Sequence, residues 1–364
     1  MSTMRFLIFF LWCSSLQAQV QEVRIGTTLP LSGKLSFIGN AYLRGIQLGI
    51  NQLNADEDLR SRWVFKLVVE DNGGDAARGA SSAHKLVDVD KVEVLFTNTT
   101  HVATAVAPIA AQQGVLMFYA ATVRTPAEKY ETIFRDYFDA ADSGRTLATR
   151  VLQDRRARIA VLAEQSEACE SFVASFLAVF PNRAVIVASD AYSPGEADFK
   201  SMLLRLGAKS PDAIVLCAWR DTSVVMRQMK QVLPHAPPTY HWVAPFLPQS
   251  DTPEIRALLE DNHAVSTWYA LPEGVQSEKL EAFTAQFQRA YSEKPRPDSA
   301  YAYDDLMALG RAMKSCGSIR STCTIDFLRT QNHAGISGEF SFSDGRVSRR
   351  QVFLMHVEKG LWTR

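Results

Sequence analysis

The sequence lacks several features that would assign it to a common functional class. Its 364 residues carry 39 Lys and Arg against 39 Asp and Glu, so there is no basic surplus to indicate a nucleic-acid partner. It contains no H-E-x-x-H, G-x-S-x-G or C-x-x-C motif, and its seven histidines are scattered. We therefore expect no catalytic residues, no cofactor, no metal site and no nucleic-acid binding.

Long apolar runs are also scarce. The segment Phe6–Trp12 is uniformly apolar, but it is shorter than the roughly 20 residues that span a bilayer. One positive charge precedes this run, and small and polar residues follow it as far as Gln19, which is the pattern of a secretory signal peptide. We expect residues 1–18 to form a signal peptide that is cleaved after Ala18, so that the mature chain is exported.

Cysteine is infrequent, with five residues in the whole chain. Cys13 lies in the expected signal peptide. Cys316 and Cys323 enclose a short polar loop between two helical patterns, and in an oxidising compartment this arrangement favours a local disulfide. Cys169 and Cys217 either pair or remain buried thiols, and the sequence leaves both alternatives open.

Two glycine-containing turns resemble ligand-binding loops but have the wrong spacing. Gly33–Lys34 would end a phosphate-binding loop, yet Thr28 and Leu35 stand where that loop needs a glycine and a hydroxyl residue. The acidic stretch Glu70–Asp75 is too short for a calcium-binding EF-hand loop. We interpret the first as a strand-to-helix turn and the second as a turn with a helix cap.

Apolar strand-like runs alternate with helical patterns along the chain. This order predicts parallel sheets with helices on both faces. A second set of such units begins at Arg158, so we expect two α/β lobes. In the first set the expected strands are Val23–Leu29, Phe65–Glu70, Val92–Phe96 and Val115–Tyr119, and the expected helices are Ala41–Asn54, Ala76–Val87 and Val102–Gln113. Near the C-terminus, an Asp-Gly turn at Asp344–Gly345 is expected to join two strands.

Ligands of open α/β sheets bind beyond the carboxyl ends of the strands. Thr99, Thr100 and Thr122 fall at such ends in the first set. Hydroxyl groups at the start of a helix suit a carboxylate or another anion. Trp219 and Phe246 fall at strand ends in the second set, where an aromatic ring could stack on a ligand. Position alone equally allows the threonines to be helix caps and the aromatic residues to be loop packing.

Six stretches, taken in order along nearly the whole mature chain, resemble the leucine/isoleucine/valine-type periplasmic binding proteins of ABC transporters. They are "IGTTLPLSGKLSFIGNAYLRGIQLGINQLNA", "VVEDNGGDAARGASSAHKLV", "GVLMFYAAT", "DFKSMLLRL", "FTAQFQRAYSEKPRPDSAYAYDDLMAL" and "GISGEFSFSDGRV". Each stretch is a weak signal alone, and their common order makes the resemblance specific.

The resemblance implies the type I periplasmic binding fold, in which two Rossmann-like lobes with parallel central sheets are joined by a hinge. It places residues 19–140 and 266–338 in lobe 1, and residues 141–265 and 339–364 in lobe 2. It also implies a monomer in the periplasm that closes over a small-molecule ligand and delivers it to an ABC permease in the inner membrane. The alternative is a ligand sensor of the same fold that acts on a signalling partner.

The family's ligand contacts in lobe 1 carry over to hydroxyl residues of this sequence. Thr100, with Thr99 beside it, matches the hydroxyl residue that binds the α-carboxylate of an amino acid. Thr122 matches a second hydroxyl residue, and Ala120 matches the backbone carbonyl that takes the ammonium group. Ser32 matches the cleft-facing turn after the first strand.

Lobe 2 departs from the family's pattern. The first aromatic contact aligns near Ala168, so it is missing, whereas Trp219 keeps the second. Phe246 stands where the family has the acid that pairs with the ammonium group, and burying an unpaired ammonium is costly. The expected ligand is therefore a small carboxylate- or amide-bearing molecule with an apolar or aromatic body.

Overall fold

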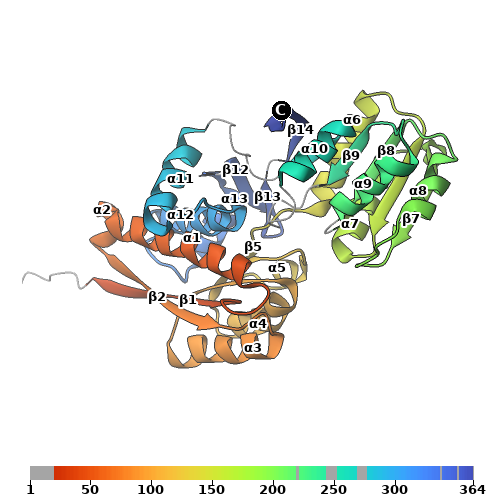
Figure 1. Ribbon diagram of the computed structural model, residues 1–364. Coiled ribbons are helices and arrows are strands. Elements are labelled where there is room, and N and C mark those ends of the chain that lie inside the picture. The colour runs from red at the N-terminus through yellow and green to blue at the C-terminus, as the bar shows by residue number, and fades with distance from the viewer. Residues whose placement is uncertain are drawn as a thin grey trace, which may run out of the picture.

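The chain folds into two α/β lobes, as Figure 1 shows. The computed structural model describes residues 20–218, 221–242, 252–268, 277–336, 338–350 and 352–363. The expected signal peptide, residues 1–18, lies outside the described residues. Within the part of the chain that is described, no helix combines the length and apolar character needed to cross a membrane.

The first lobe is built on an eight-stranded sheet with the order β11-β12-β13-β5-β4-β3-β1-β2. The strands β1 to β5 pair in parallel, and an antiparallel meander of β11, β12 and β13 extends the sheet beyond β5. The strands are β1 (Gln21–Leu29), β2 (Trp63–Asp71), β3 (Val94–Asn98), β4 (Leu116–Ala120), β5 (Ile133–Arg135), β11 (Asn332–Gly335), β12 (Gly338–Asp344) and β13 (Val347–Arg350).

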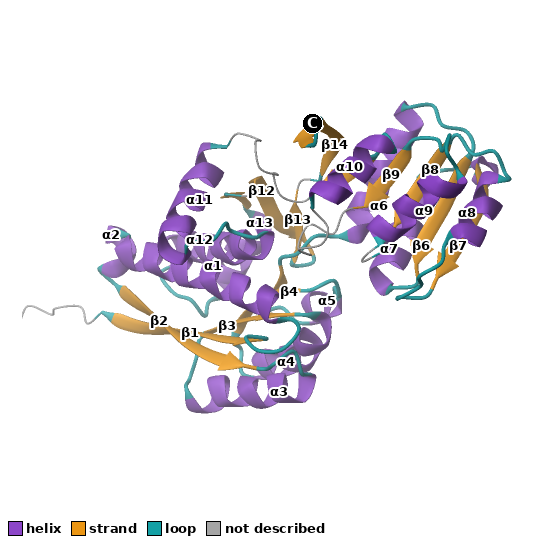
Figure 2. Cartoon of the chain, viewed as in Figure 1, coloured by secondary structure: helices purple, strands orange, loops and turns teal. Residues whose placement is uncertain are grey.

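Helices cover both faces of this sheet (Figure 2). Helices α1 and α12 pack together on one face, and α3 and α4 pack together on the other. The helices of the lobe are α1 (Ser36–Ala55), α2 (Glu57–Arg60), α3 (Ala76–His84), α4 (Thr100–Gln112), α5 (Thr125–Lys129), α11 (Glu278–Tyr291), α12 (Pro297–Cys316) and α13 (Thr322–Thr330), with one π-helical turn at Lys85–Val89.

The second lobe is built on a seven-stranded sheet with the order β15-β14-β10-β9-β8-β6-β7. Its strands are β6 (Ile159–Glu164), β7 (Ile186–Tyr192), β8 (Ala213–Cys217), β9 (Thr239–Trp242), β10 (Val265–Trp268), β14 (Phe353–Glu358) and β15 (Leu361–Thr363). Its helices are α6 (Ala140–Gln153), α7 (Glu167–Ala178), α8 (Lys200–Gly207), α9 (Thr222–Val232) and α10 (Pro253–Asp261), with a 3-10 turn at Arg183–Val185.

Alternation along β6 explains why both faces of the second sheet carry helices. Ile159 and Val161 pack into the core beneath α6 and α7, whereas Ala160 and Leu162 pack into the core beneath α8, α9 and α10. Every residue of β3, β4, β6 and β8 is buried, and these strands are apolar apart from Thr97 and Asn98 at the end of β3 and Glu164 at the end of β6. The predicted fold class, two Rossmann-like lobes with parallel central sheets, is confirmed.

Sheet membership differs from the expected lobe division near two crossings. Residues 338–350 pair within the first sheet, although residues from 339 onward were expected in lobe 2. Strand β10, which extends to Trp268, pairs with β9 and β14 of the second sheet. The expected bounds came from the family resemblance, whereas backbone pairing assigns these residues to a sheet. We propose residues 20–137 and 277–350 as lobe 1, and residues 138–268 and 352–363 as lobe 2.

The turn predicted between the late strands is present. Asp344 and Val347 are paired across β12 and β13, and the two residues between them, Gly345 and Arg346, have φ values of 59° and 65°. Positive φ at both central residues is typical of the type I′ hairpin turn.

Both cysteine pairs form disulfides. The predicted bond between Cys316 and Cys323 is present at the end of α12, with a Cα–Cα distance of 5.7 Å. Cys169 and Cys217, which the sequence left open, are also joined, with a Cα–Cα distance of 5.7 Å. Both residues of this second pair are fully buried.

Candidate functional site

A cavity of about 550 Å³ lies between the lobes at the carboxyl ends of their parallel strands. Its volume is in the range of small-molecule sites. The first lobe contributes Ile38, Thr99, Thr100, Ala120, Ala121, Thr122 and Tyr137 to its lining. The second lobe contributes Glu164, Ser166, Glu167, Ala168, Pro194, Gly195 and Asp221.

Thr99 has a strained backbone at the N-terminus of α4. Its φ of 66° and ψ of 141° lie in a region that non-glycine residues rarely adopt. It occupies the N-cap position, but its side chain makes no capping hydrogen bond, and within the described residues no group bonds to its buried Oγ1. Because the first N–H groups of a helix have no partner inside it, this uncapped end suits a hydrogen-bond acceptor from a ligand.

Thr100 and Thr122 bring the two predicted hydroxyl positions together. Their Oγ1 atoms lie 2.9 Å apart, which joins the start of α4 to the loop after β4. The carbonyl of Ala120, the last residue of β4, accepts the Thr99 N–H at 3.1 Å and retains a second lone pair. Four of the predicted site residues therefore line one continuous wall of the cavity (Thr99, Thr100, Ala120 and Thr122).

Ser32 is not brought to this wall. It is exposed, and its backbone N–H donates to Asp71 Oδ1 at 3.3 Å, beside a 2.9 Å bond from Leu31 N–H. Burial alone would raise the pKa of Asp71, but hydrogen bonds from the Ser32 side chain and from the N–H groups of Gly73, Leu31 and Ser32 lower it. Ser32 thus organises the turn beside β2 and does not line the described cavity.

The predicted aromatic contacts of lobe 2 cannot be placed beside these residues. Trp219 and Phe246 lie outside the described residues. Ala168, near which the family's first aromatic contact aligns, lines the cavity with a small side chain.

Three carboxylates on the second-lobe wall were not among the predicted site residues. Glu164 ends β6, Glu167 opens α7, and Asp221 precedes α9. Burial raises the pKa of Tyr192, and the charges of Asp221 and Glu164 raise it further. The signal in the sequence was their position at or shortly after the ends of the apolar strands β6 and β8.

The disulfide between Cys169 and Cys217 braces this wall. Cys169 lies in the first turn of α7, next to Ala168, and Cys217 ends β8. The side chain of Ser166 caps the same helix by accepting the Cys169 N–H at 3.5 Å. The disulfide therefore fixes the start of α7 against the end of β8. Much of the second-lobe wall comes from these two places.

A cavity between two hinged parallel-sheet lobes, lined from both sides by strand ends, defines the class of two-lobed solute-binding proteins. The chain belongs to the periplasmic binding protein family, whose model matches residues 22–361. The resemblance to branched-chain amino acid-type members of this family is confirmed by the relatives that it matches. Family and fold are those of solute-binding proteins rather than enzymes.

Curated relatives include a Leu/Ile/Val-binding protein homolog of Brucella melitensis, 23% identical over 202 residues that cover 54% of each chain. Another is the Leu/Ile/Val-binding protein BraC3 of Rhizobium johnstonii, 22% identical over 59% of this chain and 60% of the relative. This chain spans only about half the length of the curated relatives that it matches.

Solved structures extend the similarity of fold to nearly the whole chain. The LivJ protein of Streptococcus pneumoniae in complex with isoleucine has a TM-score of 0.74 and 20% identity, covering 94% of this chain and 98% of that one. A solute-binding protein from R. palustris in complex with benzoate has a TM-score of 0.70 and 17% identity, covering 94% and 95%. At these identities the comparisons establish the fold alone.

Proposed function

We propose that this chain is a periplasmic solute-binding protein of an ABC importer, which closes its two lobes over a small ligand. The observation that carries the proposal is the cavity shared by both lobes, with the Thr100–Thr122 hydroxyl pair beside an uncapped helix start. The chain would act as a monomer and deliver its ligand to a permease in the inner membrane. Closure about the hinge would remove the ligand from water.

The ligand is proposed to carry a carboxylate or amide end. This end would accept hydrogen bonds from Thr100, Thr122 and the first N–H groups of α4. An apolar or aromatic body would then contact Ile38 and Tyr137 of the lining. Trp219 and Phe246, which lie outside the described residues, stay predicted aromatic contacts from lobe 2. The ligands named for the two neighbouring structures, isoleucine and benzoate, have a carboxylate in common, which supports this orientation.

A thermal-shift screen of the chain from Gln19 onward tests the proposal. The panel contains aliphatic and aromatic carboxylates, their amides, and the amino acids. A ligand at 100 times its dissociation constant adds about 2.7 kcal/mol of stability, so one class of compound should raise the melting temperature clearly. If leucine outperforms every aromatic and aliphatic acid, the ligand class is wrong; if nothing in the panel shifts the melting temperature, the binding function itself fails the test.

Thr100→Ala is expected to weaken binding of the best ligand by about ten- to a hundred-fold. The reason is that a hydrogen bond to a charged group contributes about 1.5–3 kcal/mol. Isothermal titration calorimetry measures the change. Thr104→Ala is the matched control, because Thr104 is an exposed threonine one turn further along α4 whose hydroxyl bonds to the Thr100 carbonyl at 2.9 Å. Equal losses in both variants would remove Thr100 from the site.

A further inference from the structure

Two consecutive aromatic residues of the first crossing between the lobes each have a ring contact with a different lobe. The ring of Tyr137 lies 6.2 Å from that of Tyr301 on α12, which belongs to the first lobe. The next ring, that of Phe138, lies 5.7 Å from that of Trp242 on β9, which belongs to the second lobe. The two rings also pack on each other, with centroids 4.2 Å apart, and we take the bond between Tyr137 and Phe138 as the pivot of this crossing.

A buried arginine on the first-lobe side ties this pivot to the ligand loop. Arg135 is 1% exposed, and its guanidinium donates to the carbonyls of Ala121 at 2.7 Å and Thr122 at 3.2 Å. It also donates to the carbonyls of Phe138 at 2.7 Å and Tyr137 at 3.4 Å. One side chain thus holds the cavity-lining loop and the crossing segment in a fixed relation.

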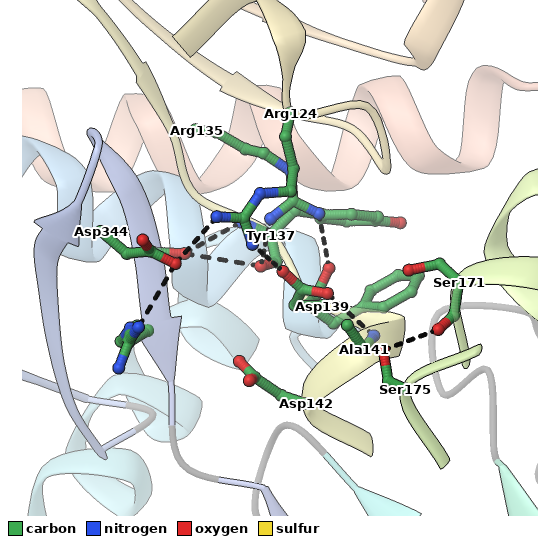
Figure 3. Close-up of polar contacts among 12 residues, drawn as sticks. Arg124, Arg135, Tyr137, Asp139, Ala141, Asp142, Ser171, Ser175 and Asp344 are labelled. Atoms are coloured by element: carbon green, nitrogen blue, oxygen red, sulfur yellow. Dashed lines mark hydrogen bonds and ion pairs between the residues drawn. The ribbon is translucent and has the colours of Figure 1, made fainter. Parts of the chain in front are cut away.

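A second arginine reaches across the pivot to the helix that follows. Arg124 donates from Nη1 to Asp139 Oδ2 at 2.6 Å and from Nη2 to Asp344 Oδ2 at 2.8 Å (Figure 3). The other oxygen of Asp139 accepts the Ala141 N–H at 2.8 Å and so caps α6. Asp344 belongs to β12, in the same sheet-defined lobe as Arg124, whereas Asp139 moves with α6.

We propose that Arg124 and Asp139 form a latch across the pivot, which restrains the direction in which the lobes rotate and so sets how readily a ligand in the cavity closes them. Arg124 cannot follow α6 freely, because Asp344 and Glu128 hold the same guanidinium on the first lobe. The Asp139 side chain is only 8% exposed, so its pairing is poorly screened by water. Asp139 lies one residue beyond the pivot, where rotation displaces it little, so the pair persists through closure and guides it.

The substitution Asp139→Asn distinguishes the role of Asp139 in the latch from its role as the helix cap. Asparagine caps a helix about as well as aspartate, so α6 keeps its start while the charge on the latch is lost. Asp344→Asn is the matched control, because it removes the other carboxylate from the same guanidinium but breaks a contact within one lobe. The two variants differ in whether the lost ion pair crosses the pivot, and the Asp139 side chain is also the more buried one, at 8% against 38% exposed.

Distances between the lobes provide the primary test and need no identified ligand. Spin labels on Ala77→Cys of α3 and Leu204→Cys of α8, both exposed, report the distance distribution by electron double resonance. We expect Asp139→Asn to broaden this distribution, with Asp344→Asn matching the unsubstituted chain. Arg124→Lys, which keeps the charge but cannot hold two carboxylates in one planar fork, should broaden it as well. The latch is overturned if Asp139→Asn and Arg124→Lys give the same distribution width as the unsubstituted chain. It is also overturned if Asp344→Asn broadens the distribution as much as these two variants do.

Ligand affinity provides a second readout, and this part rests on the proposed function. In Asp139→Asn the latch no longer restrains the direction of closure, so the ligand must fix that direction itself and binds less tightly. We expect the dissociation constant to rise about five-fold. Asp344→Asn should leave it unchanged. If the chain binds no ligand, the proposed function fails while the distance distributions still decide the latch; if it binds and Asp139→Asn matches Asp344→Asn, the coupling of the latch to ligand binding is wrong.

Discussion

Replacing Arg350 with methionine is expected to lower the free energy of unfolding by about 3–5 kcal/mol, the cost of breaking a buried ion pair from one side. The Arg350 side chain is 3% exposed. It donates from Nε to Asp136 at 2.7 Å and from Nη1 to Asp304 at 3.2 Å. Its guanidinium also lies 4.4 Å from the centroid of Tyr301 and 4.3 Å from that of Phe340. Methionine would keep much of the volume but leave two buried carboxylates without this cation.

Arg349 provides the matched control for this substitution. It is the neighbouring residue on β13, its side chain is 65% exposed, and it lies 3.5 Å from Asp344. An exposed pair of this kind contributes roughly 0–1 kcal/mol, so Arg349→Met should change stability little. Urea denaturation followed by circular dichroism compares the two variants. Similar midpoints for Arg350→Met and the unsubstituted chain would show that the buried cluster does not hold β13, α12 and the first crossing together.

Removing the disulfide between Cys169 and Cys217 is expected to destabilise the protein more than removing the one between Cys316 and Cys323. Closing a loop in the unfolded chain accounts for about 4 kcal/mol at a sequence separation of 48 residues and about 2 kcal/mol at a separation of 7. The comparison uses the double variants Cys169→Ala/Cys217→Ala and Cys316→Ala/Cys323→Ala. Chemical denaturation of both measures the difference.

The first of these disulfides should also affect ligand binding, whereas the second should not. Cys169 and Cys217 fix the start of α7 against the end of β8, beside the cavity, and the other pair lies at the end of α12. Calorimetry on the folded variants should therefore show weaker binding only for Cys169→Ala/Cys217→Ala. Equal affinity in both variants would mean that the second-lobe wall keeps its shape without the bond.

The layered fold could be predicted because its signal is local. Expected strands such as Val23–Leu29 and Val115–Tyr119 overlap β1 and β4, since a strand covered on both faces is a continuous apolar run. Boundaries were less accurate. Helix α1 begins at Ser36 rather than near Ala41, and no side chain at its N-cap marks that start in the sequence.

The cavity wall of the first lobe was also accessible from sequence, because hydroxyl residues at two strand ends converge when the strands are parallel neighbours. Thr100 and Thr122 meet in this way. Ser32 does not, because its turn is fixed by Asp71, a residue 39 positions away whose contact no local pattern reveals. The carbonyls held by Arg135 were equally inaccessible, since main-chain acceptors carry no sequence signature.

Small-angle X-ray scattering with and without the best ligand from the screen tests the central claim most directly. The account predicts that the ligand reduces the radius of gyration of the unsubstituted chain, because the two lobes close over the cavity. Thr100→Ala at the same ligand concentration should remain extended. A ligand that binds tightly without compacting the chain would contradict closure over the cavity between the lobes.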